Sequence, residues 1–458
     1  MKLIRTKGRG AQQAAIMLSA LEQRGSAALD TVLPAVKRIV ADVRKRDDPA
    51  LLRYAAEFDG LACADDLLVT QEEMATAWEA TDPAMRLALC TAAEQIRGFA
   101  VSQLPASFSE EPVPGLTTGQ LVRPLGSVGC YVPSGRHPLP STLLMTAIPA
   151  QVAGVERIAV VSPKPALETL AAAHLLGITE FYRVGGAQAV AALAYGTESI
   201  QHVIKIVGPG NLYVTAAKRL VAFDCAIDML AGPTEAVVTS ERGNAAAIAS
   251  DLVAQAEHDP EALCIFITTQ TELAKEVIAE AKLRSRDNAI ARQALDSNGL
   301  VILASSADEA HAITNRLAPE HLTVDAASDL DWVQNAGSVF VGRFSAQPMG
   351  DYISGPNHTL PTGGMARVRG GLSVNDFVKL ITVQEYTAQA LRSLGQPAVL
   401  LAEAEGLYGH AEAIRTRLQK KRSSTSPASS GRKQTYSSSR SAREIRQLAN
   451  PQSPRSGG

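Results

Sequence analysis

The hydrophobic positions from about Val122 onward alternate between two periods. Short runs rich in β-branched residues are separated by longer stretches whose apolar residues recur at helical spacing. The first series of short runs is SVGCYV, IAVV, FYRV, HVIKIV and AVVT, and the second is CIFITT, LVILAS, LTVDA and SVFVG. Alternating strands and helices predict parallel, doubly wound sheets with right-handed crossovers. We therefore expect an α/β protein with two Rossmann-like parallel-sheet domains.

The segments that flank this alternation have helical patterns. Over the first ~100 residues apolar side chains recur at helical spacing, as at Val36, Val40 and Val43. A last helix is expected from Pro397 to Gln419, broken near Gly406 and Gly409. The predicted divisions are an N-terminal helical arm at 1–25, a discontinuous first α/β domain at 26–127 and 236–372, an inserted α/β domain at 128–235, a C-terminal helical segment at 373–419 and a tail at 420–458.

Composition separates the tail from the rest of the chain. From Lys420 the sequence is rich in Ser, Arg and Lys and nearly free of aromatic residues, which predicts disorder. The tail has nine basic residues and one acid, or +8, and this leaves 35 basic and 45 acidic residues, or −10, in the first 419. The net charge of −2 is therefore an average. A solvated appendage is the simpler interpretation; the tail is also the one feature that favours nucleic acid as a partner.

Three further observations bound the class of protein. No stretch approaches the ~18 uninterrupted apolar residues of a membrane span. Gln12, Gln13 and Glu22 interrupt what would be the apolar region of a signal peptide. The five cysteines are scattered and never spaced as CxxC, so neither a disulfide framework nor a thiolate metal site is indicated. We expect a cytoplasmic protein without membrane contacts.

Three loops follow predicted strands and lead into predicted helices: YVPSGRHPLPST, RVGGAQAV and KIVGPGN. Binding loops of parallel sheets lie at the carboxyl ends of strands, where glycine lets a phosphate approach the backbone and a helix N-terminus. None of the loops matches GxGxxG. Spacing alone leaves open both nucleotide binding and ordinary tight turns, although the length of the first loop favours a functional role.

Side chains able to bind a metal occur in three other motifs. Gln255 and His258 stand three apart near the end of a predicted helix and so share one face. Asp351 and His358 lie in a Gly/Pro-rich loop, and His410 lies near the predicted end of the fold. Together Gln255, His258, Asp351 and His410 supply mixed N and O ligands without sulfur, as an open catalytic zinc site does. A helix-capping role is the alternative for His258, and the sequence does not show whether the four residues meet.

The dipeptide Glu320-His321 ends a predicted helix just after Pro319 and precedes a predicted strand. In such a turn both side chains can face one cleft, where a carboxylate and an imidazole divide proton transfers between them. The alternative is a histidine at a helix C-terminus beside an exposed glutamate.

Taken together, these motifs resemble the histidinol dehydrogenase family. The resemblance extends from the N-terminal helices to about Gln419 and depends on nine motifs in the same order: GCYVP, VGGAQAVAALAYGT, VGPGN, AGPTE, QAEHDP, APEHL, GSVFVG, GDYISGPNHTLPT and EGLYGH. Each motif is weak by itself, whereas their joint order is specific.

The resemblance implies a homodimer that oxidises L-histidinol through the aldehyde to L-histidine, the last steps of histidine biosynthesis, with two NAD and one Zn²⁺ per subunit. By family likeness Glu320 would activate water and His321 would be the base for the alcohol and hydrate protons. The metal would be held by Gln255, His258, Asp351 and His410, which with His321 would also contact the substrate, as would Thr234, His358 and Glu405. NAD would contact the inserted domain through Tyr131, Gln188 and Asn211. Glu405 and His410 would serve the partner's site, so the active sites would be shared.

This sequence departs from the family pattern in a few places. Thr234 stands where some members have serine, and it keeps the hydroxyl. Ser134, Arg136 and His137 replace smaller residues of the first loop. The basic tail is outside the pattern. Three alternatives remain: a paralogous zinc- and NAD-dependent dehydrogenase of another small alcohol, a zinc hydrolase, and a nucleotide-binding scaffold whose basic tail recruits an anionic partner.

Overall fold

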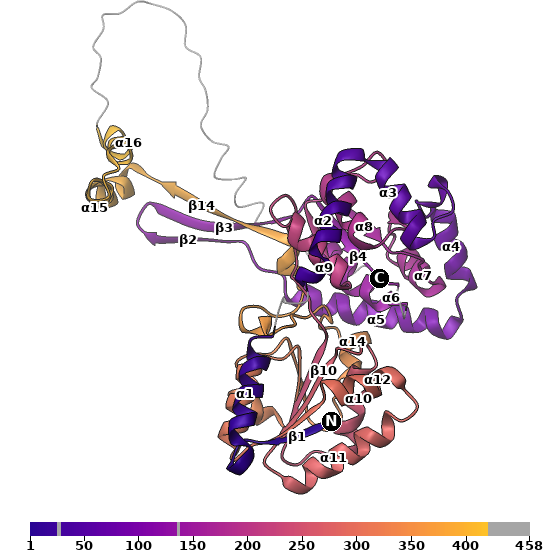
Figure 1. Ribbon diagram of the computed structural model, residues 1–458. Helices are drawn as coiled ribbons and strands as arrows, with labels where there is room; N and C mark the ends of the chain where they lie inside the picture. Colours follow the sequence, from indigo (N-terminus) through magenta and orange to yellow (C-terminus); the bar gives the residue numbers. More distant parts are fainter. Residues whose placement is uncertain (25–28, 135–137, 420–458) are drawn as a thin grey trace, which may run out of the picture. The chain divides into compact units, whose positions relative to one another are not determined.

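The computed structural model describes residues 1–24, 29–134 and 138–419 (Figure 1). It divides into two compact units: Met1–Leu104 with Pro124–Phe377, and Pro105–Arg123 with the chain from Val378 onward. Both predicted parallel sheets lie in the first unit. The tail predicted at 420–458 lies outside the described residues, as do Arg136 and His137.

A five-stranded parallel sheet forms from the first series of predicted strands. Its order is β6-β5-β4-β7-β8, with the first strand in the middle, which is the order of a doubly wound sheet and confirms the predicted fold class. The fifth run, AVVT, follows the predicted end of the inserted domain at 235 and lies in the other sheet as part of β9, and the two-residue β8 is the fifth strand here. The strands are β4 (Ser127–Tyr131), β5 (Arg157–Val161), β6 (Glu180–Tyr182), β7 (Lys205–Val207) and β8 (Ala226–Ile227), connected by α6 (Pro140–Ala153), α7 (Leu167–Leu175), α8 (Gly186–Tyr195) and α9 (Leu212–Val221).

The N-terminal helices pack on this sheet's helices. They are α2 (Leu29–Arg46), α3 (Asp48–Tyr54), α4 (Gln71–Ala80) and α5 (Pro83–Ser102). α2 contacts α8 and α9, α4 contacts α7, and α5 contacts α6. Val36, Val40 and Val43 share one apolar core with Val190 and Leu193 of α8. The helical periodicity is confirmed, but the prediction that 26–127 groups with 236–372 is wrong, because these amphipathic helices bury their apolar faces against the five-stranded half.

A six-stranded parallel sheet forms the other half of the first unit, in the order β1-β11-β10-β9-β12-β13. Its strands are β1 (Lys2–Arg5), β9 (Glu235–Thr239), β10 (Leu263–Thr268), β11 (Leu300–Leu303), β12 (His321–Val324) and β13 (Ser338–Val341). Its helices are α1 (Ala11–Glu22), α10 (Ala245–Ala256), α11 (Thr271–Arg284), α12 (Ala289–Ser297) and α13 (Ala307–Leu317). The segment 1–25 is therefore not only a helical arm, since β1 pairs with β11 at the edge of the sheet. Four residues are too few for periodicity to reveal a strand.

The second unit holds a three-stranded sheet, in the order β14-β3-β2, and two helices. Its elements are β2 (Phe108–Val113), β3 (Leu116–Pro124), β14 (Val378–Tyr386), α15 (Ala388–Ala404) and α16 (Tyr408–Leu418). The predicted break in the last helix is confirmed at Gly406, whose φ of 74° is costly for other residues, whereas Gly409 lies inside α16 and does not break it. The segment 373–419 is not wholly helical, because it contains β14, and its helices begin before Pro397.

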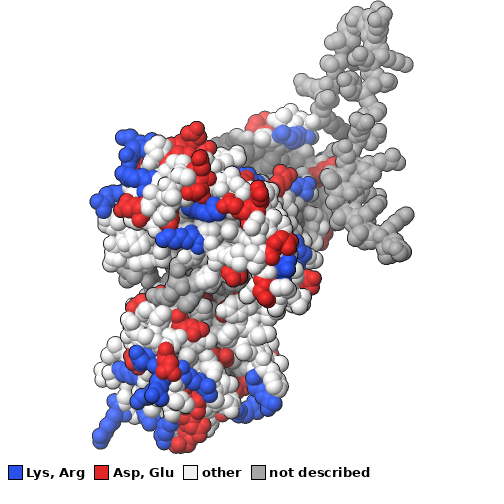
Figure 2. All heavy atoms as spheres, turned by 90° about the vertical axis from the view of Figure 1, so that its right-hand side faces the viewer, with Lys and Arg blue, Asp and Glu red and all other residues white. Residues whose placement is uncertain are grey.

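The surface and the thiols agree with the composition. On the face shown in Figure 2, basic and acidic side chains are interspersed over the described residues. All five cysteines are free thiols. Within the described ranges no helix is long and apolar enough to cross a membrane.

Candidate active site

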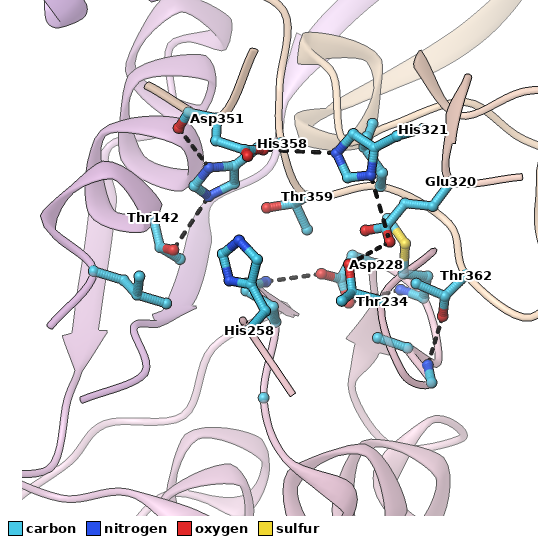
Figure 3. Close-up of a pocket in the computed structure, with 18 of the residues that line it drawn as sticks. Thr142, Asp228, Thr234, His258, Glu320, His321, Asp351, His358, Thr359 and Thr362 are labelled. Carbon is cyan, nitrogen blue, oxygen red and sulfur yellow. Dashed lines mark hydrogen bonds and ion pairs between the residues drawn. The ribbon is translucent and has the colours of Figure 1, made fainter. Parts of the chain in front are cut away.

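A pocket of about 190 Å³ in the first unit brings residues of both parallel sheets together. One wall lies at the carboxyl ends of β4 and β7, and includes Ser141 at the start of α6 and Gly208 in the loop after β7. Another wall comes from residues that precede β9 or begin β12. The predicted site residues that line the pocket are Thr234, Gln255, His258, Glu320, His321, Asp351 and His358 (Figure 3).

Glu320 lies in the turn between α13 and β12, and its carboxylate is buried. The helix ends here because Ala318 is left-handed, with a φ of 47°, and Pro319 follows it. One carboxylate oxygen, Oε2, accepts hydrogen bonds from Thr234 Oγ1 and from the backbone N–H of Glu235, each at 2.7 Å. Burial nevertheless raises the pKa of Glu320 to about 7. Such a carboxyl group can accept and release a proton near neutral pH, as a general base must.

The hydroxyl of Thr234 links Glu320 to Gln255. It donates to the Glu320 carboxylate and accepts from Gln255 Nε2. Because Nε2 is held in this way, Gln255 Oε1 is left buried with no hydrogen-bond partner among the described residues. An acceptor of this kind beside a polar pocket needs a cation or a donor from a ligand.

His321 is the first residue of β12, and its ring lies between two carboxylates. Nδ1 is 3.1 Å from the backbone oxygen of Glu235 and 3.6 Å from Glu320 Oε2, whereas Nε2 is 3.6 Å from Asp351 Oδ1. Since a carbonyl only accepts, Nδ1 carries the proton and Nε2 is the basic atom of the neutral ring. Burial opposes the charged form, but the carboxylates of Glu320 and Asp351 outweigh it and raise the pKa of His321 to about 9.

Two of the predicted metal ligands flank Gln255 in the same pocket. Gln255 lies in the last turn of α10 and His258 follows that helix. Asp351 lies in a short helix, α14 (Pro348–Tyr352), where a loop was expected. Burial favours the neutral carboxyl group, but the hydrogen bond and charge of His321 outweigh it and lower the pKa of Asp351, so Asp351 stays ionised. Among the described residues, no three His, Cys, Asp or Glu side chains converge closely enough to hold a metal ion by themselves.

His358 is a fixed, neutral imidazole on the pocket wall (Figure 3). Its Nδ1 lies 2.8 Å from the backbone oxygen of Asp351, and its Nε2 lies 3.1 Å from Thr142 Oγ1. Burial lowers the pKa of His358. Because both ring nitrogens already have protein partners, neither is free to ligate a metal.

The predicted NAD residues do not line this pocket, although Gly208 to Gly210 of the adjoining loop do. Tyr131 is buried at the end of β4, where its hydroxyl accepts from Gly186 N–H at 3.0 Å. Gln188 is buried in α8 and donates to Asp59 at 3.0 Å. Asn211 caps α9 by accepting from the backbone N–H groups of its first turn.

The last two predicted site residues, Glu405 and His410, belong to the second unit. Glu405 ends α15, and His410 lies in the first turn of α16. The other predicted ligands lie in the first unit.

The sequence reasoning missed a buried ion pair on the pocket wall. Lys218 Nζ and Asp228 Oδ1 are 2.6 Å apart, and both residues contact Gly208. The lysine donates to the Gly208 carbonyl at 2.6 Å, and Asp228 Oδ2 accepts from the Gly208 N–H at 2.7 Å. A charged residue on the apolar face of α9, and an aspartate next to β8, were the signals available. The hydroxyls of Ser141, Thr142, Thr359 and Thr362 were missed as lining groups as well.

Comparisons with known proteins agree with this geometry. The histidinol dehydrogenase family model matches residues 22–418. Histidinol dehydrogenase of Methanothermobacter thermautotrophicus is 45% identical over 416 residues, covering 88% of this chain and 97% of that protein. The Geobacillus kaustophilus enzyme is 45% identical over 434 residues, covering 92% and 100%. The crystal structure of histidinol dehydrogenase from Elizabethkingia anophelis superposes with a TM-score of 0.85 at 34% identity, covering 91% of this chain and 98% of that one. The chain therefore belongs to the histidinol dehydrogenase family.

Proposed function

We propose that this protein oxidises L-histidinol through L-histidinaldehyde to L-histidine, using two NAD⁺ and one Zn²⁺ per site. Family membership supports an oxidoreductase of histidine biosynthesis that acts on histidinol, and it favours the cytoplasm as its location. The observation that carries the chemistry is the buried pair Glu320 and His321 in one pocket with Gln255, His258 and Asp351.

The residues present fit a zinc ion. Gln255 Oε1 is a buried acceptor without a partner, and it shares the pocket with an imidazole and with an ionised carboxylate, Asp351. We assign Gln255, His258 and Asp351 as three ligands and the partner subunit's His410 as the fourth. When bound, the ion would orient the substrate through its imidazole and amine. If Asp351 is a zinc ligand, the metal charge offsets the charge of its carboxylate, which then raises the pKa of His321 less. The pKa of His321 therefore falls toward the range in which an imidazole accepts a proton.

The two bases divide the proton transfers of the two oxidations. In the first, His321 Nε2 would take the alcohol proton, and the carbinol carbon would give up its hydride to bound NAD⁺, leaving the aldehyde and NADH. Glu320 then takes a proton from water as the water oxygen bonds to the aldehyde carbon, and His321 returns its proton to the aldehyde oxygen, which gives the hydrate and leaves His321 neutral again. In the second oxidation His321 would take a hydrate proton, and the hydrate carbon would give up its hydride to a second NAD⁺, leaving the acid. His358 and Thr234 hold and orient the substrate, since both lie on the pocket wall.

We place NAD at the carboxyl edge of the five-stranded sheet. Gly208 to Gly210 border the substrate pocket, and Asn211 begins α9 beside them, so the nicotinamide ring could reach the carbinol carbon from this side. Tyr131 and Gln188 line the same edge and support the neighbouring Gly185–Gly186 turn.

We further propose a homodimer in which the second unit completes the partner's site with Glu405 and His410. The exposure of the second unit supports this, because most residues of β14 and two leucines of α15, Leu400 and Leu401, are open to solvent in the single chain. A buried interface would give these side chains a partner.

The proposal is tested by adding L-histidinol and NAD⁺ to the purified protein and following NADH absorbance. We expect about two NADH per histidine formed, loss of activity after complete metal removal, and recovery with Zn²⁺. A protein that forms no NADH with metal present is not a histidinol dehydrogenase, and activity that survives complete metal removal would exclude the zinc role.

Mixing two inactive variants tests the shared sites. A Glu320→Gln, His321→Asn protein and a His410→Asn protein should regain part of the activity after subunit exchange, because one mixed site then has every residue intact. Heterodimers verified by tagging that stay inactive would contradict ligands donated across an interface.

A further inference from the structure

Arg24 is a largely buried cation outside the pocket, and its contacts converge on the backbone that supports the catalytic pair. Its side chain is 15% exposed. Nε and Nη2 donate to the two carboxylate oxygens of Glu235, each at 2.6 Å. Nη1 donates to the carbonyl of Leu21 and Nη2 to that of Leu317, each at 2.7 Å. Four of the five N–H groups of the guanidinium are therefore used, and they join the end of α1, the start of β9 and the end of α13.

Glu235 carries this restraint to the active site. Its side chain is 3% exposed and, besides Arg24, accepts from the backbone N–H of Gly363 at 2.9 Å. Its own backbone contacts both catalytic residues: the N–H donates to Glu320 Oε2 at 2.7 Å, and the carbonyl lies 3.1 Å from His321 Nδ1. A single peptide segment thus orients both bases.

The hydrogen bond from Arg24 to the Leu317 carbonyl restrains a second backbone segment next to Glu320 and His321. Leu317 is the last residue of α13, and the turn that follows it carries Glu320. The guanidinium therefore fixes both backbone segments that meet at the pair: the first residue of β9 and the end of α13.

We propose that Arg24 is a positioning residue for Glu320 and His321. The inference rests on the roles given to this pair in the proposed function. Because both bases depend on the same peptide, loss of Arg24 should slow both oxidations, unlike loss of Glu320. A lysine cannot replace it, since an ammonium group lacks the planar fork that grips a carboxylate and two carbonyls together.

The test compares Arg24→Met and Arg24→Lys with the matched control Arg316→Met. Arg316 joins the same two helices, because it pairs with Glu22 at the end of α1, but this bridge is at the surface, with 54% of the Arg316 side chain exposed. Oxidation of histidinol and of supplied histidinaldehyde is measured for each protein at a temperature well below its melting midpoint.

We expect kcat of Arg24→Met to fall about 10- to 100-fold in both half-reactions, as for a misplacement of catalytic groups on the order of 1 Å. KM for histidinol and NAD⁺ should change by less than about twofold, because the substrate contacts remain. Arg24→Lys should be nearly as slow as Arg24→Met, and Arg316→Met should resemble the wild type. Glu235→Gln keeps the shape of the side chain and one acceptor, so its kcat should fall between those of Arg24→Met and the wild type.

Three outcomes would overturn the role of Arg24: an unchanged kcat in Arg24→Met, an equal loss in Arg316→Met, or a change confined to KM. If Arg24→Met does not fold, an unchanged kcat in Glu235→Gln has the same meaning. A wild-type protein that forms no NADH overturns the proposed function and this role with it, whereas an active wild type with an active Arg24→Met overturns only the role of Arg24.

Discussion

The two parallel sheets have the same strand order but contribute opposite edges to the pocket. If the strands are numbered along the chain from β4 in one sheet and from β9 in the other, both sheets have the order third, second, first, fourth, fifth. The six-stranded sheet has β1 as an additional edge strand next to β11. The five-stranded sheet contributes loops at the carboxyl ends of its strands, such as Gly208. The six-stranded sheet contributes Thr234 and Glu320, which precede strands, and His321, which begins one. Equal topology therefore does not fix which edge is used.

The carboxyl edge of the six-stranded sheet shows why the usual rule fails there. A cavity exists at that edge, but a carboxylate of the protein itself already occupies the hydrogen-bond donors of the loop after β9. The Asp325 carboxylate accepts from Ser240 Oγ at 2.5 Å and from the backbone N–H of Glu241 at 2.8 Å. At the opposite edge lies the C-terminal end of α10, where Gln255 and His258 line the same pocket as Glu320. Ligands favour carboxyl edges because loops and helix N-termini there present free N–H groups, and an internal carboxylate removes that advantage.

The largest expected effect is at the amino edge of the six-stranded sheet. His321→Asn should lower kcat for the first oxidation by about 10²- to 10⁴-fold, because it removes the proposed general base. Glu320→Gln should spare that step and slow the conversion of supplied histidinaldehyde. Single-turnover NADH formation from each substrate measures both steps. Equal losses in both steps for Glu320→Gln would contradict the division of labour.

A large effect on stability is expected at the carboxyl edge of the five-stranded sheet. Lys218→Met leaves the buried Asp228 carboxylate without its cation, so the free energy of unfolding should fall by about 3–5 kcal/mol. Urea unfolding measures the change. The exposed pair Lys275–Glu272 is the control, and Lys275→Met should have no measurable effect. A Lys218→Met protein as stable as the wild type would show that the pair does not hold the Gly208 loop.

A smaller effect is expected from the hydroxyl between the metal ligand and the base. Thr234→Val removes the donor to Glu320 and the acceptor for Gln255, so activity should fall roughly tenfold, equivalent to about 1.4 kcal/mol. Thr234→Ser keeps the hydroxyl and should stay close to the wild type. Steady-state rates with histidinaldehyde compare the two variants, and a Thr234→Val enzyme as active as Thr234→Ser would exclude the bridging role.

The smallest effect is expected at the unused carboxyl edge of the six-stranded sheet. Burial raises the pKa of Asp251 to about 6, so the folded protein binds its proton at a higher pH than the unfolded chain does. The charged form is therefore destabilising above pH 6, and that penalty is lost as the pH falls through about 6 toward 4. Asp251→Asn should stabilise the fold at pH 8 by about 1 kcal/mol, a value reduced because the group is partly exposed.

Urea unfolding of the Asp251→Asn protein at pH 8 and pH 4.5 checks the sign, since the gain should shrink at the lower pH. Its kcat should match the wild type within about twofold. A large fall in kcat would mean that the carboxyl edge of the six-stranded sheet takes part in catalysis. It would contradict the conclusion that the two sheets contribute opposite edges to the active site.

Much of this fold could be predicted from the sequence, because the spacing of apolar residues within each helix or strand shows which of its faces is buried. β-branched runs between amphipathic helices predicted both parallel sheets, and Gly406 marked the break between α15 and α16. The same local signals could not show that β1 pairs with β11 or that α2 packs on α8, since the apolar pattern of one element does not indicate which other element it contacts.

The candidate site divides in the same way. The residue types and motif order determined the family and the candidate chemistry of Glu320, His321, Gln255, His258 and Asp351. Only the tertiary structure joined Thr234 to Glu320 across 86 positions and left Gln255 Oε1 without a partner. It alone placed Glu320 and His321, the proposed catalytic pair, at the amino edge of their sheet and Arg24 behind them. The physical reason is that hydrogen-bond satisfaction and desolvation depend on neighbours brought together by packing, and no local pattern in the chain encodes them.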